Sequence, residues 1–352
     1  MTSTDGTGAD PLVTETVDRL LASSSTPEVI DRAEDAGWCA EVWDPLAELG
    51  FPWISVPEAA GGSGGSLVDA FEVVRAVGRH AAPVPVAETA LLGGWLAGAV
   101  GWDVAGRVLT VVPRSEALTL EGGQVRGRAV VPWAHRADAV LAVLDGPDGT
   151  RVASARPEQL RIERRANMAG EPRDVVTFEL PLAEMQTAPG PDGLDGAALL
   201  GRGCLARVVL AAGALEAVSQ LTIAYTSERQ QFGKPIATFQ AVQQHMVTVA
   251  QADVRASMSA QVAIRAAARD PRAVFEIAAA RVVVDQAIVE ATRASHQAHG
   301  AMGLAREYRL QQYTRRLWSW RSEFGSARSW SRVLGRQVAA AGADALFPGI
   351  TR

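Results

Sequence analysis

The N-terminal part of the chain carries apolar residues at helical spacing, in short pieces. Val42, Leu46 and Leu49 form one such piece, with the three- and four-residue steps of a helix face. The segment GFPWISVPEAAGGSGGS is too rich in glycine and proline to continue a helix, and Ser66 at its end is a candidate N-cap for the next one. The pattern predicts a small helical domain over residues 1–104.

The pattern changes over residues 105–192, where short runs of β-branched and other apolar residues replace the helical spacing. RVLTVV, AVLAVL and DVVTFEL are examples, and glycine, proline and aspartate separate the runs. The polar stretch TAPGPDGLDG follows the last run and has the composition of a boundary. We predict a small antiparallel β domain here.

The remaining residues, 193–352, return to helical spacing and keep it for most of their length. The lengths of the apolar stripes are typical of a bundle of antiparallel helices, and Pro271 suits the start of one of them. The predicted fold is therefore α+β and mostly α, with a helical domain, a β domain and a C-terminal four-helix bundle. The predicted helices of the bundle cover Ala198 to Gln231, Phe239 to Ala268, Arg272 to His296 and Leu310 to Ala341.

The composition excludes several classes of function. The 352 residues carry a formal net charge of −5 with both signs interspersed, so the chain lacks the basic stripe that binding to nucleic acid needs. Cys39 and Cys204 stand alone, without the ligand spacing of a metal site. Neither a membrane-spanning apolar run nor the pattern of a secretory signal is found, so we expect a cytoplasmic protein.

One segment of the last part resembles a known family. YTSERQQFGKPIATFQAVQQHM, Tyr225 to Met246, is similar to the R-x-Q-F-G-x-P-I-x-x-F-Q segment of the acyl-CoA dehydrogenase family, and Gln240 opens the second helix. LAELGFPWISVPEAAGGSGGSLVDAFEVVRAVGRH and HQAHGAMGLAREY resemble other parts of the same family. The resemblance implies an FAD enzyme, usually a tetramer, that oxidises the Cα–Cβ bond of an acyl-CoA thioester to a trans-2-enoyl-CoA.

The resemblance also implies a set of cofactor contacts. Arg229, Phe232 and Gln240 would contact the ADP half of FAD across a dimer interface. Gln297 and the backbone from Gly300 to Gly303 would line the same cofactor. These residue types fit the task, because a guanidinium pairs with pyrophosphate and glycine lets the main chain approach it closely. The alternative interpretation makes Arg229 a solvated helix-end charge and Phe232 a core residue.

A base must remove the α-proton of the thioester, and the resemblance implies Glu307, four residues after Gly303. Other family members place the base on an earlier helix, at a position that is Ala206 here. Arg207, beside it, matches a residue that contacts CoA. The alternatives are a solvated Glu307 paired with a neighbouring arginine and a surface position for Arg207.

The sequence departs from the family on the side of the flavin ring. GRAVVPW, Gly127 to Trp133, has valine where the family strand has tryptophan and Trp133 where it has threonine. SEFGSARSW resembles the family's E-G-T-S-Q segment and keeps Gly325 and Ser326, which implies a flavin contact for Ser326, but it has Arg328 in place of the usual glutamine.

Three hypotheses follow from these matches and departures. The first is an acyl-CoA dehydrogenase or a subunit of one, acting with FAD on an acyl-CoA and passing electrons to an electron-transfer flavoprotein. The second is a non-catalytic partner that completes the FAD site of a full-length subunit, because the chain resembles the shortened actinobacterial subunits of heterotetrameric members. The third is a flavin-dependent monooxygenase of the same fold. The assembly would be a homotetramer or a heterotetramer.

Overall fold

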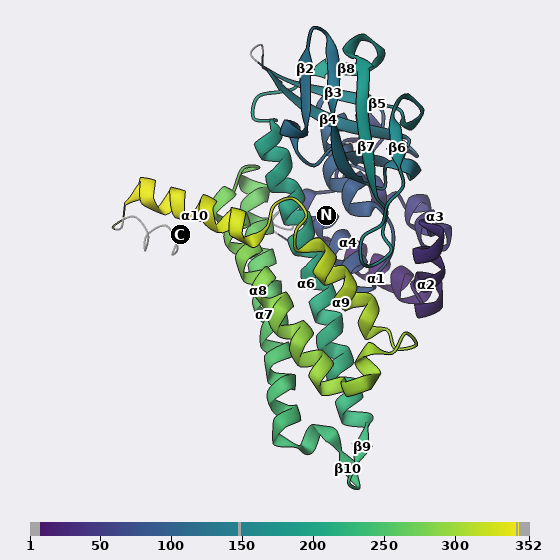
Figure 1. Cartoon of the computed structure of the whole chain (residues 1–352), viewed down its shortest axis with the longest axis vertical. Coiled ribbons are helices and arrows are strands. Elements are labelled where there is room, and N and C mark those ends of the chain that lie inside the picture. The colour runs from purple at the N-terminus through teal and green to yellow at the C-terminus, as the bar shows by residue number, and fades with distance from the viewer. Residues whose placement is uncertain (1–7, 147–148, 343, 345–352) are drawn as a thin grey trace, which may run out of the picture.

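The structure is a computed structural model that describes residues 8–146, 149–342 and 344. The fold has an N-terminal helical part, a middle part of β-sheets and a C-terminal part of long helices (Figure 1). In the N-terminal part, Ser66 is the N-cap of the helix Leu67–Arg79 and forms a capping box with Asp69, which confirms the predicted N-cap. The helices of this part are α1 (Pro11–Ser24), α2 (Pro27–Ala36), α3 (Ala40–Glu48), α4 (Leu67–Arg79) and α5 (Gly94–Ala99), with a π-helical segment, Ala87–Gly93, before α5.

The middle part contains two four-stranded sheets, with strand orders β1-β4-β5-β8 and β2-β3-β7-β6. Their strands are β1 (Leu109–Val111), β2 (Leu118–Glu121), β3 (Gln124–Pro132), β4 (Ala139–Gly146), β5 (Gly149–Ala155), β6 (Arg161–Glu163), β7 (Arg173–Pro181) and β8 (Gln186–Pro189). An apolar core of its own, which includes Val125, Val140 and Phe178, joins the two sheets. The strand pairs are antiparallel as predicted, except that β1 pairs with β4 in parallel.

The C-terminal part consists of α6 (Gly196–Glu228), α7 (Gln240–Arg269), α8 (Val274–His299), α9 (Leu310–Trp320) and α10 (Ala327–Ala341). The short hairpin of β9 (Gln230–Gln231) and β10 (Lys234–Pro235) closes the end of the bundle that points away from the sheets (Figure 1). By length and composition α6 could cross a membrane. However, 83% of its most apolar window is buried inside the protein, which is the property of a core helix.

Two predictions about this part are wrong in detail. The last helix does not run from Leu310 to Ala341 but breaks into α9 and α10, because Phe324 and Gly325 adopt φ angles of 51° and 95° that no α-helix contains. Pro271 does not start a helix, since it lies in the turn between the end of α7 and the start of α8. Gln240 does open α7, as expected.

Candidate functional site

A groove of about 560 Å³ lies at the hairpin end of the bundle, and we call it the hairpin groove. Its walls come from the end of α6, the hairpin, the start of α7 and the 3-10 turn Gly300–Leu304 that follows α8. Four of the residues that the resemblance assigns to the cofactor line this groove together: Arg229, Phe232, Gln297 and Gly300.

The chemistry of these side chains suits a ligand that carries phosphate. Arg229 is the C-cap of α6, it is exposed, and among the described residues its guanidinium has no side-chain hydrogen bond or ion pair. Phe232 is 91% exposed, with a φ of 52°, so the core position considered for it is wrong. Gly300 has φ 58° and ψ −139°, a conformation that essentially only glycine adopts.

Three other residues expected at the cofactor lie outside the lining of this groove. Gln240 is exposed at the first position of α7. Gly303 is the buried residue of the turn Gly300–Leu304, and an added Cβ there would lie 3.0 Å from Cβ of His299. Ser326 caps α10, since its hydroxyl accepts a hydrogen bond from the Ser329 amide at 3.3 Å. Their contacts with FAD stay predictions.

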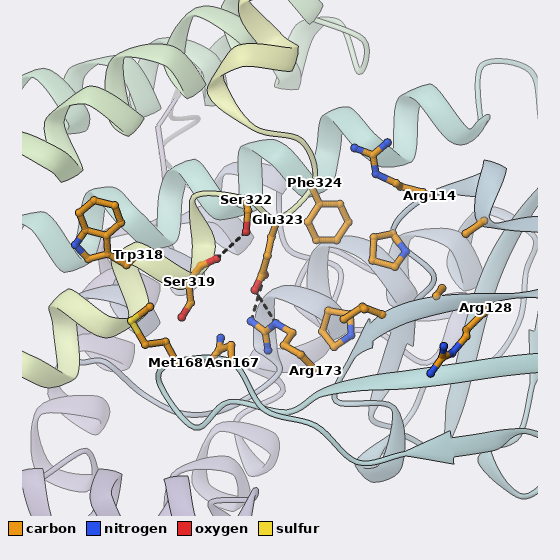
Figure 2. Close-up of a pocket in the computed structure, with 15 residues that line it drawn as sticks. Arg114, Arg128, Asn167, Met168, Arg173, Trp318, Ser319, Ser322, Glu323 and Phe324 are labelled. Atoms are coloured by element: carbon orange, nitrogen blue, oxygen red, sulfur yellow. Dashed lines mark hydrogen bonds and ion pairs between the residues drawn. The ribbon is translucent and has the colours of Figure 1, made fainter.

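A second cavity, of about 640 Å³, separates the sheets from the bundle, and we call it the interdomain cavity (Figure 2). One wall is β3, with Arg128 at its edge. Asn167 and Met168, from the loop before β7, form a second wall. The third wall is the break between α9 and α10, which brings in Glu323 and Phe324.

Glu323 is the one carboxylate among the described residues that line the interdomain cavity, and two arginines hold it. Its Oε1 lies 2.7 Å from Nε of Arg173, and its Oε2 lies 2.6 Å from Nε of Arg207. Burial alone would raise the pKa of Glu323, but the two guanidinium groups lower that pKa to about 2. A carboxylate with so low a pKa is a poor acceptor for a carbon-bound proton.

Phe324 closes the floor of this cavity beside Glu323. Its ring packs against Gly203 of α6, where an added Cβ would lie only 2.1 Å from the ring. The guanidinium of Arg207 lies over the ring, 5.2 Å from its centroid. The indole N–H of Trp330 donates to the Phe324 carbonyl at 3.0 Å. Contacts from two helices therefore fix a residue whose backbone is strained.

The residues expected at the substrate are not gathered in either cavity. Glu307 is exposed on the turn before α9, it lines neither cavity, and it makes no side-chain hydrogen bond or ion pair within the described part of the chain. Arg207 is 1% exposed and is not a surface arginine. Its Nη2 lies 2.5 Å from Oε1 of Glu88, and its second partner is Glu323. The contact of Arg207 with CoA stays a prediction that its burial does not favour.

Sequence reasoning did not single out Glu323, Phe324 or Arg173. The signal for Phe324 was present, because the residue before Gly325 is glutamate in the E-G-T-S-Q segment and phenylalanine here. No signal existed for the ion pairs, since Arg173, Arg207 and Glu323 lie far apart along the chain and meet only through the packing of the sheets on the bundle.

Comparisons with known proteins agree on one family. The model of the acyl-CoA dehydrogenase N-terminal domain matches residues 9–99, and that of the C-terminal domain matches residues 197–338. The chain is 29% identical over 314 residues to acyl-CoA dehydrogenase IpdE2 of Mycobacterium tuberculosis, which covers 87% of this chain and 89% of that protein.

Two solved structures share the fold. A chain of the ChsE4–ChsE5 complex from Mycobacterium tuberculosis superposes with a TM-score of 0.84 at 23% identity, over 97% of this chain and 99% of that one. Butyryl-CoA dehydrogenase from Megasphaera elsdenii superposes with a TM-score of 0.79 at 16% identity, over 96% and 99% of the two chains.

Proposed function

Since the chain belongs to the acyl-CoA dehydrogenase family of FAD-dependent oxidoreductases, we propose that it works as one subunit of a mixed acyl-CoA dehydrogenase. The assembly oxidises the Cα–Cβ bond of an acyl-CoA thioester to a 2-enoyl-CoA. The contribution of this chain is the hairpin groove, which holds the ADP half of an FAD shared with a second subunit. The observation that carries this proposal is the meeting of Arg229, Phe232, Gln297 and Gly300 in one groove.

The residues of the hairpin groove fit that half of the cofactor. The free guanidinium of Arg229 suits pyrophosphate, the exposed ring of Phe232 suits an adenine face or a second chain, and the amide of Gln297 can donate or accept. FAD, when bound, supplies the acceptor for the hydride that leaves the β-carbon. This chain's own residues bind and orient its phosphate side.

The interdomain cavity supports the role of a partner rather than that of a catalytic subunit. Its one carboxylate among the described residues, Glu323, is neutralised by Arg173 and Arg207, and Phe324 stands where the family segment has glutamate. A base for the α-proton would therefore come from the second subunit. Glu307 as the base of this chain stays a prediction.

An apolar stripe on α7 favours an assembly with other chains. Val247, Val254, Met258 and Val262 are each more than half exposed and follow one face of this helix. The ChsE4–ChsE5 structure is a complex of two different proteins, which supports a mixed assembly here. An electron-transfer flavoprotein as acceptor and a cytoplasmic location stay predictions.

The test is co-expression with a full-length member of the family, followed by the flavin-to-protein ratio from the visible spectrum. We expect little flavin in the chain purified alone and one flavin per two chains in the mixed assembly. Arg229→Met in this chain should lower the flavin content of the mixed assembly. Arg269→Met is the control and should not, because Arg269 is also exposed but lies at the end of α7 that is far from the hairpin groove.

Two outcomes would count against the proposal. If the chain alone carries one flavin per chain and oxidises an acyl-CoA, it is a complete enzyme and not a partner subunit. If Glu307→Gln in this chain abolishes turnover of the mixed assembly while flavin is retained, Glu307 is the base and this chain is the catalytic one.

A further inference from the structure

Three aromatic rings meet at the hairpin groove, two of them face to face and the third tilted against both, and we call this group of rings the stack. The ring of His299, at the end of α8, lies parallel to that of Tyr225 in α6, with centroids 4.4 Å apart and an interplanar angle of 21°. Tyr308, before α9, contacts both rings, with centroids 5.2 Å from His299 and 5.7 Å from Tyr225. Tyr225 and His299 also line the groove, so the stack is part of its wall.

Hydrogen bonds fix how the His299 ring is oriented. Its Nδ1 lies 2.7 Å from the carbonyl oxygen of Ser295, so Nδ1 carries the proton and donates. Its Nε2 lies 3.3 Å from the hydroxyl of Tyr308 and accepts a hydrogen bond from it. Burial lowers the pKa of His299, which agrees with a neutral ring.

The turn between His299 and Tyr308 folds down onto this stack. Gly300, Ala301 and Met302 of the turn line the groove. Gly303 faces inward, and an added Cβ there would lie 3.0 Å from Cβ of His299 and 3.1 Å from Nδ1 of His296. His299, just before this segment, and Tyr308, just after it, both belong to the stack. The hydrogen bond between Tyr308 and His299 therefore links the two ends of the segment.

We infer that Tyr308 is a positioning residue for the hairpin groove. Through His299 it holds the turn that presents Gly300 to Met302, and this tie sets the affinity of the groove for the adenosine diphosphate half of the cofactor. Without the tie the turn gains freedom that binding must remove, and affinity falls for that reason. The inference rests on the proposed function, because it concerns the ligand assigned to the same groove.

The test measures ADP binding by calorimetry to the full-length chain, alone and in the mixed assembly freed of flavin. Tyr308→Phe removes one hydroxyl and keeps the ring. We expect ADP binding to weaken about five-fold, which is the usual effect of one neutral hydrogen bond. Tyr313→Phe is the control, because the Tyr313 hydroxyl also makes a hydrogen bond, to the Arg79 carbonyl at 3.0 Å, but Tyr313 lies outside the groove. That variant should bind ADP like the wild type.

A double variant separates positioning from a general loss of packing. If Tyr308 acts through His299, Tyr308→Phe has no further effect on ADP affinity in a chain that already carries His299→Gln. In histidine labelled with 15N, Tyr308→Phe should also shift the Nε2 signal of His299, and Tyr313→Phe should not.

The possible failures are distinct. If the wild type binds no ADP in either form, the proposed function is wrong and this inference falls with it. If the wild type binds ADP and Tyr308→Phe binds it equally well, or if the effect of Tyr308→Phe persists in the His299→Gln chain, the proposed function stands and the positioning role is wrong.

Discussion

The ring of Phe324 occupies the space that a side chain at position 203 would need. A Cβ on Gly203 would lie 2.1 Å from ring carbon Cδ1, far inside van der Waals contact. Gly201 lies on the same helix but in open surroundings, where the nearest atom to an added Cβ is Cδ1 of Ile277 at 3.9 Å. The two glycines are therefore a matched pair for testing how tightly the floor of the interdomain cavity is packed.

Gly203→Ala should lower the free energy of unfolding by about 1–3 kcal/mol, because it forces Phe324 from its position. Gly201→Ala should keep that free energy or raise it by up to about 1 kcal/mol, since alanine is the better helix former. Urea unfolding at one protein concentration measures both. Equal stabilities of the two variants would show that Phe324 does not pack on α6 as described.

Glu323 makes the stability of the chain depend on pH in a defined window. Its pKa is about 2 in the folded protein, against an ordinary value of 4.5. A lowered carboxyl pKa means that the stabilisation is complete above pH 4.5 and is lost as the pH falls toward 2. The difference in unfolding free energy between the wild type and Glu323→Gln should therefore stay constant above about pH 5 and shrink below that. Urea unfolding at several pH values tests this, and a difference that does not change with acid would contradict it.

At the scale of elements, α7 presents a face that one chain alone does not cover. Val254 is 56% exposed and Met258 is 63% exposed, one helical turn apart. Charged residues such as Asp253 and Arg255 lie beside this pair, whereas the part of α7 from Gln240 to Ala252 contains no Asp, Glu, Lys or Arg. Exposed aliphatic side chains along one face of a helix are typical of the centre of a subunit interface.

The double variant Val254→Lys and Met258→Lys should dissociate the assembly, because it places two charges in the proposed interface. The unfolding midpoint of the separated chain should change little, since both side chains are exposed there. Size-exclusion chromatography with light scattering gives the mass. Leu12→Lys on α1 is the control, because Leu12 is 71% exposed on another helix. An unchanged mass in the double variant would exclude this face as an interface.

The limits of sequence reasoning are visible in single elements. Local patterns located the helix starting at Gln240 and the cap at Ser66, because capping and periodicity depend on nearby residues. The break between α9 and α10 is different in kind. Arg281, from α8, donates to the carbonyl of Trp320 at 3.0 Å, and Gly203, from α6, makes room for Phe324. Such a break is set by distant partners, which periodicity does not report.

The same distinction holds for the functional site. The motif around Arg229 and Phe232 was found because its residues are close in sequence and meet at one hairpin. Glu88, Arg173, Arg207 and Glu323 come from all three parts of the fold, so their meeting in one network depends on tertiary packing. The sequence resemblance therefore located residues of the hairpin groove better than those of the interdomain cavity.

At the scale of the whole molecule, buried charges connect the three parts. Arg316 of α9 is fully buried, and its Nη1 lies 3.0 Å from Oε1 of Glu34 in α2. Its Nε lies 3.4 Å from Oε1 of Glu171, in the loop before β7. Glu171 in turn accepts from Arg173 at 3.0 Å, so the ion pairs continue to Glu323 at the interdomain cavity. One arginine thus contacts an acid of each of the other two parts.

Arg316→Met should remove this connection and leave Glu34 and Glu171 each short of a buried partner. We expect a loss of about 2 kcal/mol in the free energy of unfolding and faster hydrogen exchange in α2, because each carboxylate loses one charged partner and keeps only its other arginine, Arg315 for Glu34 and Arg173 for Glu171. Arg32→Met is the control. Arg32 of α2 pairs with Glu41 on the surface of the N-terminal part, and the two side chains are 61% and 60% exposed. Loss of this pair should lower the free energy of unfolding by less than about 1 kcal/mol. If exchange in α2 is the same in both variants, the apolar packing of the helices alone holds the N-terminal part in place, and the buried charges do not couple it to the bundle.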